Sequence, residues 1–139
     1  MNRHERNDRG GSMVELALLL PLLLLIFAGI GDLGRAFHDY IIITNVAREG
    51  ARYASLHVDP LVDPSFAFTK DAAIAEAQGS GITLDRSNVD VTFIPPVPPE
   101  VIGTATITVT YRFNLIVGRI FGGSVITMQS VMQMTAIGL

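Results

Sequence analysis

An apolar run in the first third of the chain constrains the fold most. No charged residue lies between Leu16 and Gly31, and Glu15 is the only charged residue between Met13 and Gly31. A helix of about 19 residues is roughly 28 Å long, close to the roughly 30 Å hydrocarbon thickness of a bilayer. The run is rich in leucine, which favours insertion into lipid. It therefore predicts a transmembrane helix over residues 11–31.

The residues before this run set its predicted orientation. The leader, residues 1–10, has three arginines and two acidic residues in the sequence MNRHERNDRG. This small positive excess predicts a cytoplasmic N-terminus by the positive-inside rule. Residues after Gly31 are then exported. The predicted location is the inner, cytoplasmic membrane, crossed once, with the C-terminal domain in the periplasm or outside the cell.

The helical pattern continues beyond the membrane without a strong breaker, and we assign residues 32–56 to an exported continuation of the helix. One face of this segment is bulky, with Phe37, Tyr40 and Ile41. Another face consists of small residues, which allow close helix–helix packing. These are Ala47, Gly50, Ala51 and Ala54. The small face fits packing against the chain's own C-terminal domain and packing against another subunit equally well.

Residues 57–139 predict a small exported α+β domain. TKDAAIAEAQGSG indicates a short helix, with Gly79 expected just after its last turn. Three later segments alternate apolar and polar residues as strands do. They are NVDVTFI, GTATITVTYRF and FGGSVITMQSVMQMTAI. Their short connections imply a three-stranded antiparallel sheet, packed against the long N-terminal helix.

Composition and motifs argue against several classes of function. The net charge is −3 and cysteine is absent, which disfavours nucleic acid as a partner and excludes disulfides and thiolate metal sites. GIGDLG, residues 29–34, matches a dinucleotide-binding pattern, but a leucine-rich helix precedes it where a short strand is required. The histidines lack metal-ligand spacing, and Asp59 and Asp63 are interpreted as solvated turn residues. We expect no cofactor, no metal and no enzymatic activity.

The opening segment resembles the class III signal of type IV pilins and pseudopilins: a charged leader, a glycine, then an apolar helix with glutamate at its fifth position. A cut after Gly10 makes Gly11 the first mature residue and Glu15 the fifth. The segments LGRAF, AREGARYAS, VTYRF and GGSVIT are similar to the TadE-like family, the minor pseudopilins of tight-adherence pilus systems. Leu16 occupies a position where this family usually has an aromatic residue.

The resemblance implies a non-enzymatic, membrane-anchored minor pilin that takes part in assembly of a Flp-type pilus. Its partners would be the bilayer, a prepilin peptidase that cuts between Gly10 and Gly11, and other pilus subunits and assembly proteins. Cleavage would create an amine at Gly11. Glu15 would then dock near the corresponding amine of a neighbouring subunit. A simpler alternative is that Glu15 only favours the helix N-terminus through the helix dipole.

Two other functional classes remain open from the sequence. In the first, Leu16 to Ala28 is part of an ordinary signal peptide, Gly29-Ile30-Gly31 mimics its cleavage site, and the product is a secreted soluble binding protein. In the second, the chain is a membrane-tethered enzyme. A mature N-terminus at Gly11 distinguishes the pilin from the secreted protein, which would start at Asp32.

Overall fold

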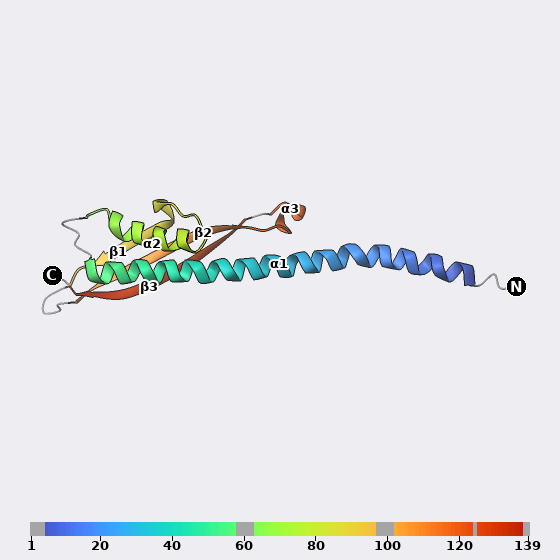
Figure 1. The fold of residues 1–139 in the computed structure, drawn as a ribbon, viewed down its shortest axis with the longest axis horizontal. Helices are drawn as coiled ribbons and strands as arrows, with labels where there is room; N and C mark the ends of the chain where they lie inside the picture. Colours follow the sequence, from blue (N-terminus) through green and yellow to red (C-terminus); the bar gives the residue numbers. More distant parts are fainter. Residues whose placement is uncertain (1–4, 58–62, 97–101, 124, 138–139) are drawn as a thin grey trace. The chain divides into compact units, whose positions relative to one another are not determined.

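The computed structural model describes residues 5–57, 63–96, 102–123 and 125–137 (Figure 1). Its elements are α1 (Glu5–His57), α2 (Ala67–Gly79), η1 (Arg86–Asn88), β1 (Val89–Ile94), β2 (Ile102–Asn114), α3 (Gly118–Phe121) and β3 (Val125–Ile137). The predicted α+β class, with a long N-terminal helix and a three-stranded antiparallel sheet, is confirmed. The first four leader residues, which include His4, lie outside the described residues, and so does Asp59 in the link.

The chain divides into two compact units. One contains the N-terminal part of α1, up to Arg35, together with Asn114–Ser124, which includes α3. The other contains Ala36–Phe113 and Val125–Leu139. The C-terminal part of α1 thus groups with the sheet. The grouping of α3 with the apolar helix had no counterpart in the sequence patterns.

The sheet has the strand order β1-β2-β3. β1 and β2 are antiparallel, and their register pairs Val89 with Val109 and Val91 with Ile107. All four of these side chains are buried, while Asp90, between two of them, is exposed. This alternation arises because successive side chains in a strand point to opposite faces. One face of the sheet therefore carries the core.

Both long helices of the second unit cover that same face. Gly50 of α1 is the point of closest approach: a Cβ atom added there would lie 3.3 Å from Ala73 Cβ of α2 and 3.3 Å from Ile107 Cγ2 of β2. The buried side chains around this point form one hydrophobic cluster. From the helices it includes Ile43, Val46, Ala47, Ala51, Ala54, Ala73 and Ala77. Small residues on α1 thus let three elements meet.

The end of α2 corrects one detail of the sequence interpretation. The helix includes Gly79, and Ser80 follows as its cap. The glycine with a left-handed backbone is Gly81, at φ 85°. Gly79 was therefore the wrong residue for the position after the last turn, because the helix continues two residues further than the apolar pattern suggested. Ile82 then donates its backbone N–H to Ala77, at 3.0 Å, which closes the turn.

Candidate membrane anchor and neighbouring sites

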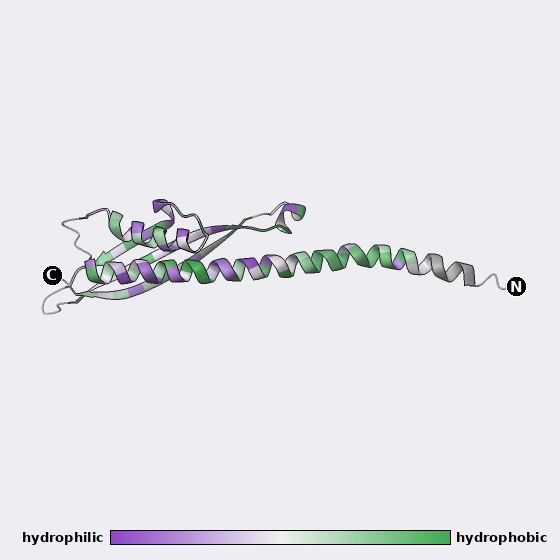
Figure 2. Cartoon of the chain, in the orientation of Figure 1, coloured by the Kyte–Doolittle hydropathy of each residue, from purple (hydrophilic) through white to green (hydrophobic). Residues whose placement is uncertain are grey.

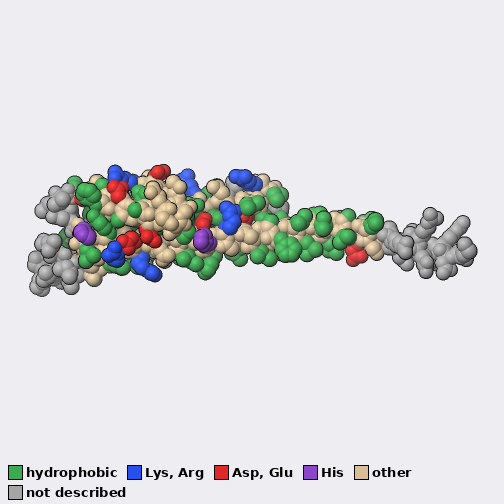
Figure 3. All heavy atoms as spheres, viewed as in Figure 1, with side chains coloured by type: hydrophobic (Ala, Val, Ile, Leu, Met, Phe, Trp, Pro, Cys, Tyr) green, Lys and Arg blue, Asp and Glu red, His purple; other side chains and the backbone are tan. Residues whose placement is uncertain are grey.

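The N-terminal half of α1 presents apolar side chains on every side. Its described residues from Gly11 onward are almost all exposed within the chain, including Leu18 at 74%, Phe27 at 67% and Leu24 at 61%. Figure 2 shows this half of the helix as almost uniformly hydrophobic, and Figure 3 shows hydrophobic side chains over its visible surface. The helix is long and apolar enough to cross a membrane. A helix that is apolar all round requires burial in lipid or protein.

The predicted processing and docking residues lie at the start of this helix. Gly10 and Gly11 are both helical, and no atom outside the adjacent helix backbone lies within 4 Å of a Cβ added at Gly11. Glu15 follows one turn later and is exposed. Its carboxylate is thus placed on an otherwise apolar helix surface. The geometry leaves Glu15 accessible to a partner.

The small-residue face has a different environment from the anchor. Ala47, Ala51 and Ala54 are fully buried, and Gly50 packs against α2 and β2 as described above. Gly50 thus packs against α2 of the same chain, and the three alanines belong to the same buried cluster as Ala73 and Ala77 of α2. Packing of this face against another subunit stays a prediction.

The bulky face of α1 remains exposed. Phe37 is 65% exposed, and Tyr40 and Ile41 are each 46% exposed. Their spacing of three and four residues places them on one side of the helix. Further along α1, Thr44 lies near Ser130 of β3, with 3.4 Å between the hydroxyl oxygens. The exposed aromatic and aliphatic side chains form an uncovered apolar surface in the second unit.

Asp32, at the end of the apolar run, makes contacts that no local sequence pattern indicates. Only 2% of its surface is exposed. One carboxylate oxygen accepts a hydrogen bond from the backbone N–H of Val117 at 2.8 Å, and the other lies 3.3 Å from the Arg35 guanidinium. The backbone N–H of Ile116 also donates to the carboxylate. Asp32 therefore attaches the β2–β3 connection to the end of the apolar run of α1.

A second contact in the same unit is apolar. Ile120 of α3, with four residues of α1, lines a hollow of about 450 Å³. The four are Pro21, Leu24, Leu25 and Ala28. All lie within the predicted transmembrane segment. The connection between β2 and β3 thus reaches past Asp32, alongside the apolar part of the helix.

Asp63 does more than the solvated turn residue that the sequence suggested. Its carboxylate accepts hydrogen bonds from the Phe68 backbone N–H at 2.9 Å and the Ser65 hydroxyl at 2.8 Å. The backbone hydrogen bond from Phe68 is the largest cause of a lowered pKa for Asp63, with Ser65 adding to it. The residue in between, Phe66, has a left-handed backbone at φ 53°. Asp63 therefore caps the start of α2 across an unusual turn.

An ion pair links α2 to the turn before β1. The Arg86 guanidinium donates two hydrogen bonds to the Asp71 carboxylate, at 2.6 and 2.8 Å. This contact lowers the pKa of Asp71 and raises that of Arg86. Both side chains are about half exposed, so solvent screens the attraction. The pair orients the turn rather than forming a reactive centre.

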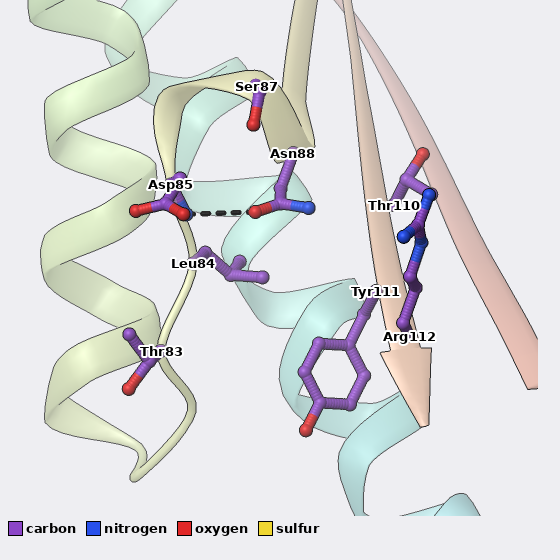
Figure 4. Close-up of a pocket in the computed structure, with 8 residues that line it drawn as sticks. All are labelled: Thr83, Leu84, Asp85, Ser87, Asn88, Thr110, Tyr111 and Arg112. Carbon is purple, nitrogen blue, oxygen red and sulfur yellow. Dashed lines mark hydrogen bonds between the residues drawn. The ribbon is translucent and has the colours of Figure 1, made fainter. Parts of the chain in front are cut away.

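A polar hollow of about 560 Å³ lies beside this turn (Figure 4). Asn88 accepts a hydrogen bond from the Asp85 backbone N–H at 2.9 Å. Tyr111 points to one side of β2, whereas Thr110 and Arg112 point to the other (Figure 4). The side chains thus do not converge on a common point, as a catalytic site requires. Within the described ranges, no three His, Asp or Glu side chains are grouped closely enough to hold a metal ion.

Comparison with known proteins adds one match. Residues 10–52 match the family described as TadE-like protein. No curated protein and no solved structure matches the chain. The matched segment contains Gly10 at the end of the leader, Glu15, the whole apolar run and the small-residue face of α1 except Ala54. Over these residues, the chain is therefore similar to the TadE-like family.

Proposed function

We propose that this protein is a non-enzymatic, membrane-anchored minor pilin or pseudopilin that takes part in assembly of a tight-adherence, Flp-type pilus. The observation that carries the proposal is the exposed apolar half of α1 within the TadE-like match. A soluble protein would leave Leu18, Leu24 and Phe27 in water, which is unfavourable by about 25 cal/mol for each Å² of apolar surface. A single membrane crossing removes that cost. The protein then resides in the inner membrane, with its N-terminus in the cytoplasm.

Processing by a prepilin peptidase would occur between Gly10 and Gly11. Both residues lie inside α1, so the peptidase must unwind the helix locally. Two adjacent glycines lower the cost of this step, because each destabilises a helix by roughly 0.5–1 kcal/mol relative to alanine. Co-expression with a prepilin peptidase, followed by mass mapping of the mature N-terminus, tests the site. We expect a start at Gly11.

The same measurement addresses the alternative function, a secreted soluble protein with a cleaved signal peptide. That protein would start at Asp32 and would be recovered outside the membrane fraction. Such a product would falsify the anchored pilin. A Gly10→Leu variant supplies a further arm: it should remain full length in the membrane if the peptidase reads the glycine before the cut. Gly79→Leu, distant in sequence from the cut, serves as the matched control.

Glu15 is the proposed docking residue. In lipid, its exposed carboxylate is unfavourable until a cation approaches it, and the new amine of Gly11 in a neighbouring subunit is such a cation. We expect Glu15→Gln to insert in the membrane normally and to be recovered less with assembled pili. Glu15→Asp, which keeps the charge, should be recovered more fully than the Gln variant. Equal recovery of all three proteins would remove the docking role and leave only the helix-dipole effect.

The exposed bulky face of α1 supplies a second subunit contact in this proposal. Phe37, Tyr40 and Ile41 form an apolar surface outside the predicted membrane segment, where lipid cannot cover it. Contact with another pilus subunit would remove that surface from water. Replacement of Ile41 by Gln should reduce co-purification with pilus subunits. Replacement of Thr127 by Gln serves as the control. Thr127 is exposed on β3, on the face opposite to that of the buried Ser130.

A further inference from the structure

We infer that the connection between β2 and β3, residues 115–123 (the tip), inserts into the outer leaflet of the bilayer beside α1, as a second membrane contact. This inference rests on the proposed membrane-spanning role of α1. The segment has the sequence LIVGRIFGG. Its ligand is the lipid itself: acyl chains for the apolar side chains and a headgroup phosphate for Arg119.

The depth of the tip follows from the residues it contacts. Ile120 shares its apolar hollow with Ala28 and Pro21, which precede Asp32 by four and eleven residues. At a rise of 1.5 Å per residue, these positions lie about 6 and 16 Å from Asp32 along the helix axis. The intervening helix is part of the predicted transmembrane segment. If α1 crosses the bilayer there, Ile120 lies at the level of acyl chains.

The exposed side chains of the tip suit that environment. Ile116 is 57% exposed and Ile120 is 69% exposed, so each keeps a large apolar surface that the protein leaves uncovered. The surface of Ile120 is continuous with the apolar surface of α1 through the hollow that Ile120 lines with Leu24 and Leu25. Arg119, between them, is exposed. Its long side chain can reach back to the headgroups while its stem lies along apolar surface.

Backbone polar groups set the strictest condition for entry into lipid, because an unpaired N–H is costly there. In the tip, the backbone N–H groups of Ile116 and Val117 bond to the buried Asp32 carboxylate. Four later N–H groups donate to carbonyl oxygens within the turn. Arg119 donates to Ile116, Ile120 to Val117, and Gly123 to Gly118, at 3.3, 3.0 and 3.1 Å, and Gly122 also donates to Gly118. The tip therefore meets this condition at six of its donors.

Two glycines make this compact turn possible. A Cβ atom at Gly118 would overlap the carbonyl oxygen of Gly123, and Gly122 has φ 79°. Side chains at these positions would open the turn and release its internal hydrogen bonds. The glycines, the Asp32 carboxylate and the two isoleucines thus act together: they close the backbone and turn apolar groups outward.

Absence of cysteine allows a direct test with the full chain. Single-cysteine variants Ile120→Cys, Leu20→Cys and Gln129→Cys are labelled with an environment-sensitive fluorophore. The labelled proteins are reconstituted in phosphatidylcholine–phosphatidylglycerol vesicles with brominated acyl chains, which quench only nearby fluorophores. Leu20 lies in the anchor, and Gln129 is exposed on β3 in the other unit. We expect the fractional loss of fluorescence at position 120 to be at least half of the loss at position 20. The label at position 129 should be hardly quenched.

The outcomes separate this inference from the proposed function. If the label at position 20 is not quenched, α1 does not span the bilayer and the proposed function fails. If position 20 is quenched and position 120 is not, only the second membrane contact is overturned. Excimer formation by pyrene at position 120 without quenching by lipid would identify a second copy of the chain as the occupant instead, and would also overturn the inference. Ile116→Cys repeats the test at a second position, should labelling at position 120 disturb the turn.

Discussion

The Asp32 carboxylate accepts a hydrogen bond from the backbone N–H of Val117, 85 residues further along the chain. The contact joins the last turn of the apolar helix to the β2–β3 connection within one compact unit. A buried carboxylate is stable only where donors surround it, and here two backbone amides and Arg35 supply them. Asp32 is therefore a structural attachment, in contrast to Glu15, whose carboxylate is exposed.

Loss of this attachment should release the β2–β3 connection. In Asp32→Ala, the N–H groups of Ile116 and Val117 lose their acceptor, so the turn should open more often. We expect trypsin to cleave after the exposed Arg119 several-fold faster than in the parent protein in detergent micelles, as measured by mass spectrometry. Asp39→Ala, further along the same helix, is the control and should leave the rate at Arg119 unchanged. Equal rates for both variants would show that Asp32 does not hold the connection.

The close approach at Gly50 makes a prediction about stability. A valine there would press against Ala73 and Ile107, and overpacking of this kind typically costs about 1–3 kcal/mol. We expect Gly50→Val to lower the free energy of unfolding by about that amount. Unfolding in denaturant, monitored by circular dichroism, provides the measurement. Gly34 lies in the same helix, and no atom outside the adjacent helix backbone lies within 4 Å of a Cβ added there. Gly34→Val should therefore have a much smaller effect, and similar losses in the two variants would contradict the packing described here.

The cap at α2 should be visible in hydrogen exchange. Asp63→Ala removes the acceptor for the Phe68 N–H, so we expect that amide and the first turn of α2 to exchange several-fold faster. Asp63→Asn keeps an oxygen acceptor and should exchange more slowly than the alanine variant. Ser87→Ala, on the neighbouring turn, is the control. Unchanged exchange at Phe68 in Asp63→Ala would show that the carboxylate is not needed as a cap.

The Asp71–Arg86 pair should give a small, pH-dependent contribution. Folding lowers the pKa of Asp71, so its contribution is present above the ordinary pKa of 3.8 and is lost as the pH falls through the lowered value. We expect Asp71→Asn to be slightly less stable than the parent at about pH 7 and equally stable once the pH lies below the lowered pKa of Asp71. Denaturation midpoints at both pH values provide the measurement. Asp90→Asn, with no ion pair among the described residues, is the control; a difference that persists in acid would point to another cause.

Local periodicity was sufficient to predict the main elements. Leucine repetition identified the apolar helix, and alternation around Ile107 and Val109 identified the central strand, because side-chain burial follows backbone geometry closely in both. The α+β class followed from those patterns. The match over residues 10–52 similarly includes Glu15 and the first six residues of the AREGARYAS motif, both of which suggested the TadE-like family.

The contacts of Asp32 and Asp63 could not be predicted in the same way. A hydrogen bond across 85 residues depends on where two elements meet, and nothing in the sequence near Asp32 or Val117 encodes that distance. Asp63 was interpreted as a turn residue because two prolines surround it, yet its carboxylate reaches Phe68, five residues later. The sequence nevertheless contains a signal for this contact of Asp63. An aspartate shortly before a helix is a common N-terminal cap.

The sheet ends at β3, a strand of 13 residues that contains no charged residue and no proline. Natural proteins usually protect such an edge with lysine, proline or a bulge, since unpaired strand backbone recruits further strands. Here Thr127, Gln129 and Val131 are exposed along that strand. The outer edge of β3 is therefore a template for intermolecular β-pairing. Self-association of the protein at high concentration will depend on whether another strand or partner covers this edge.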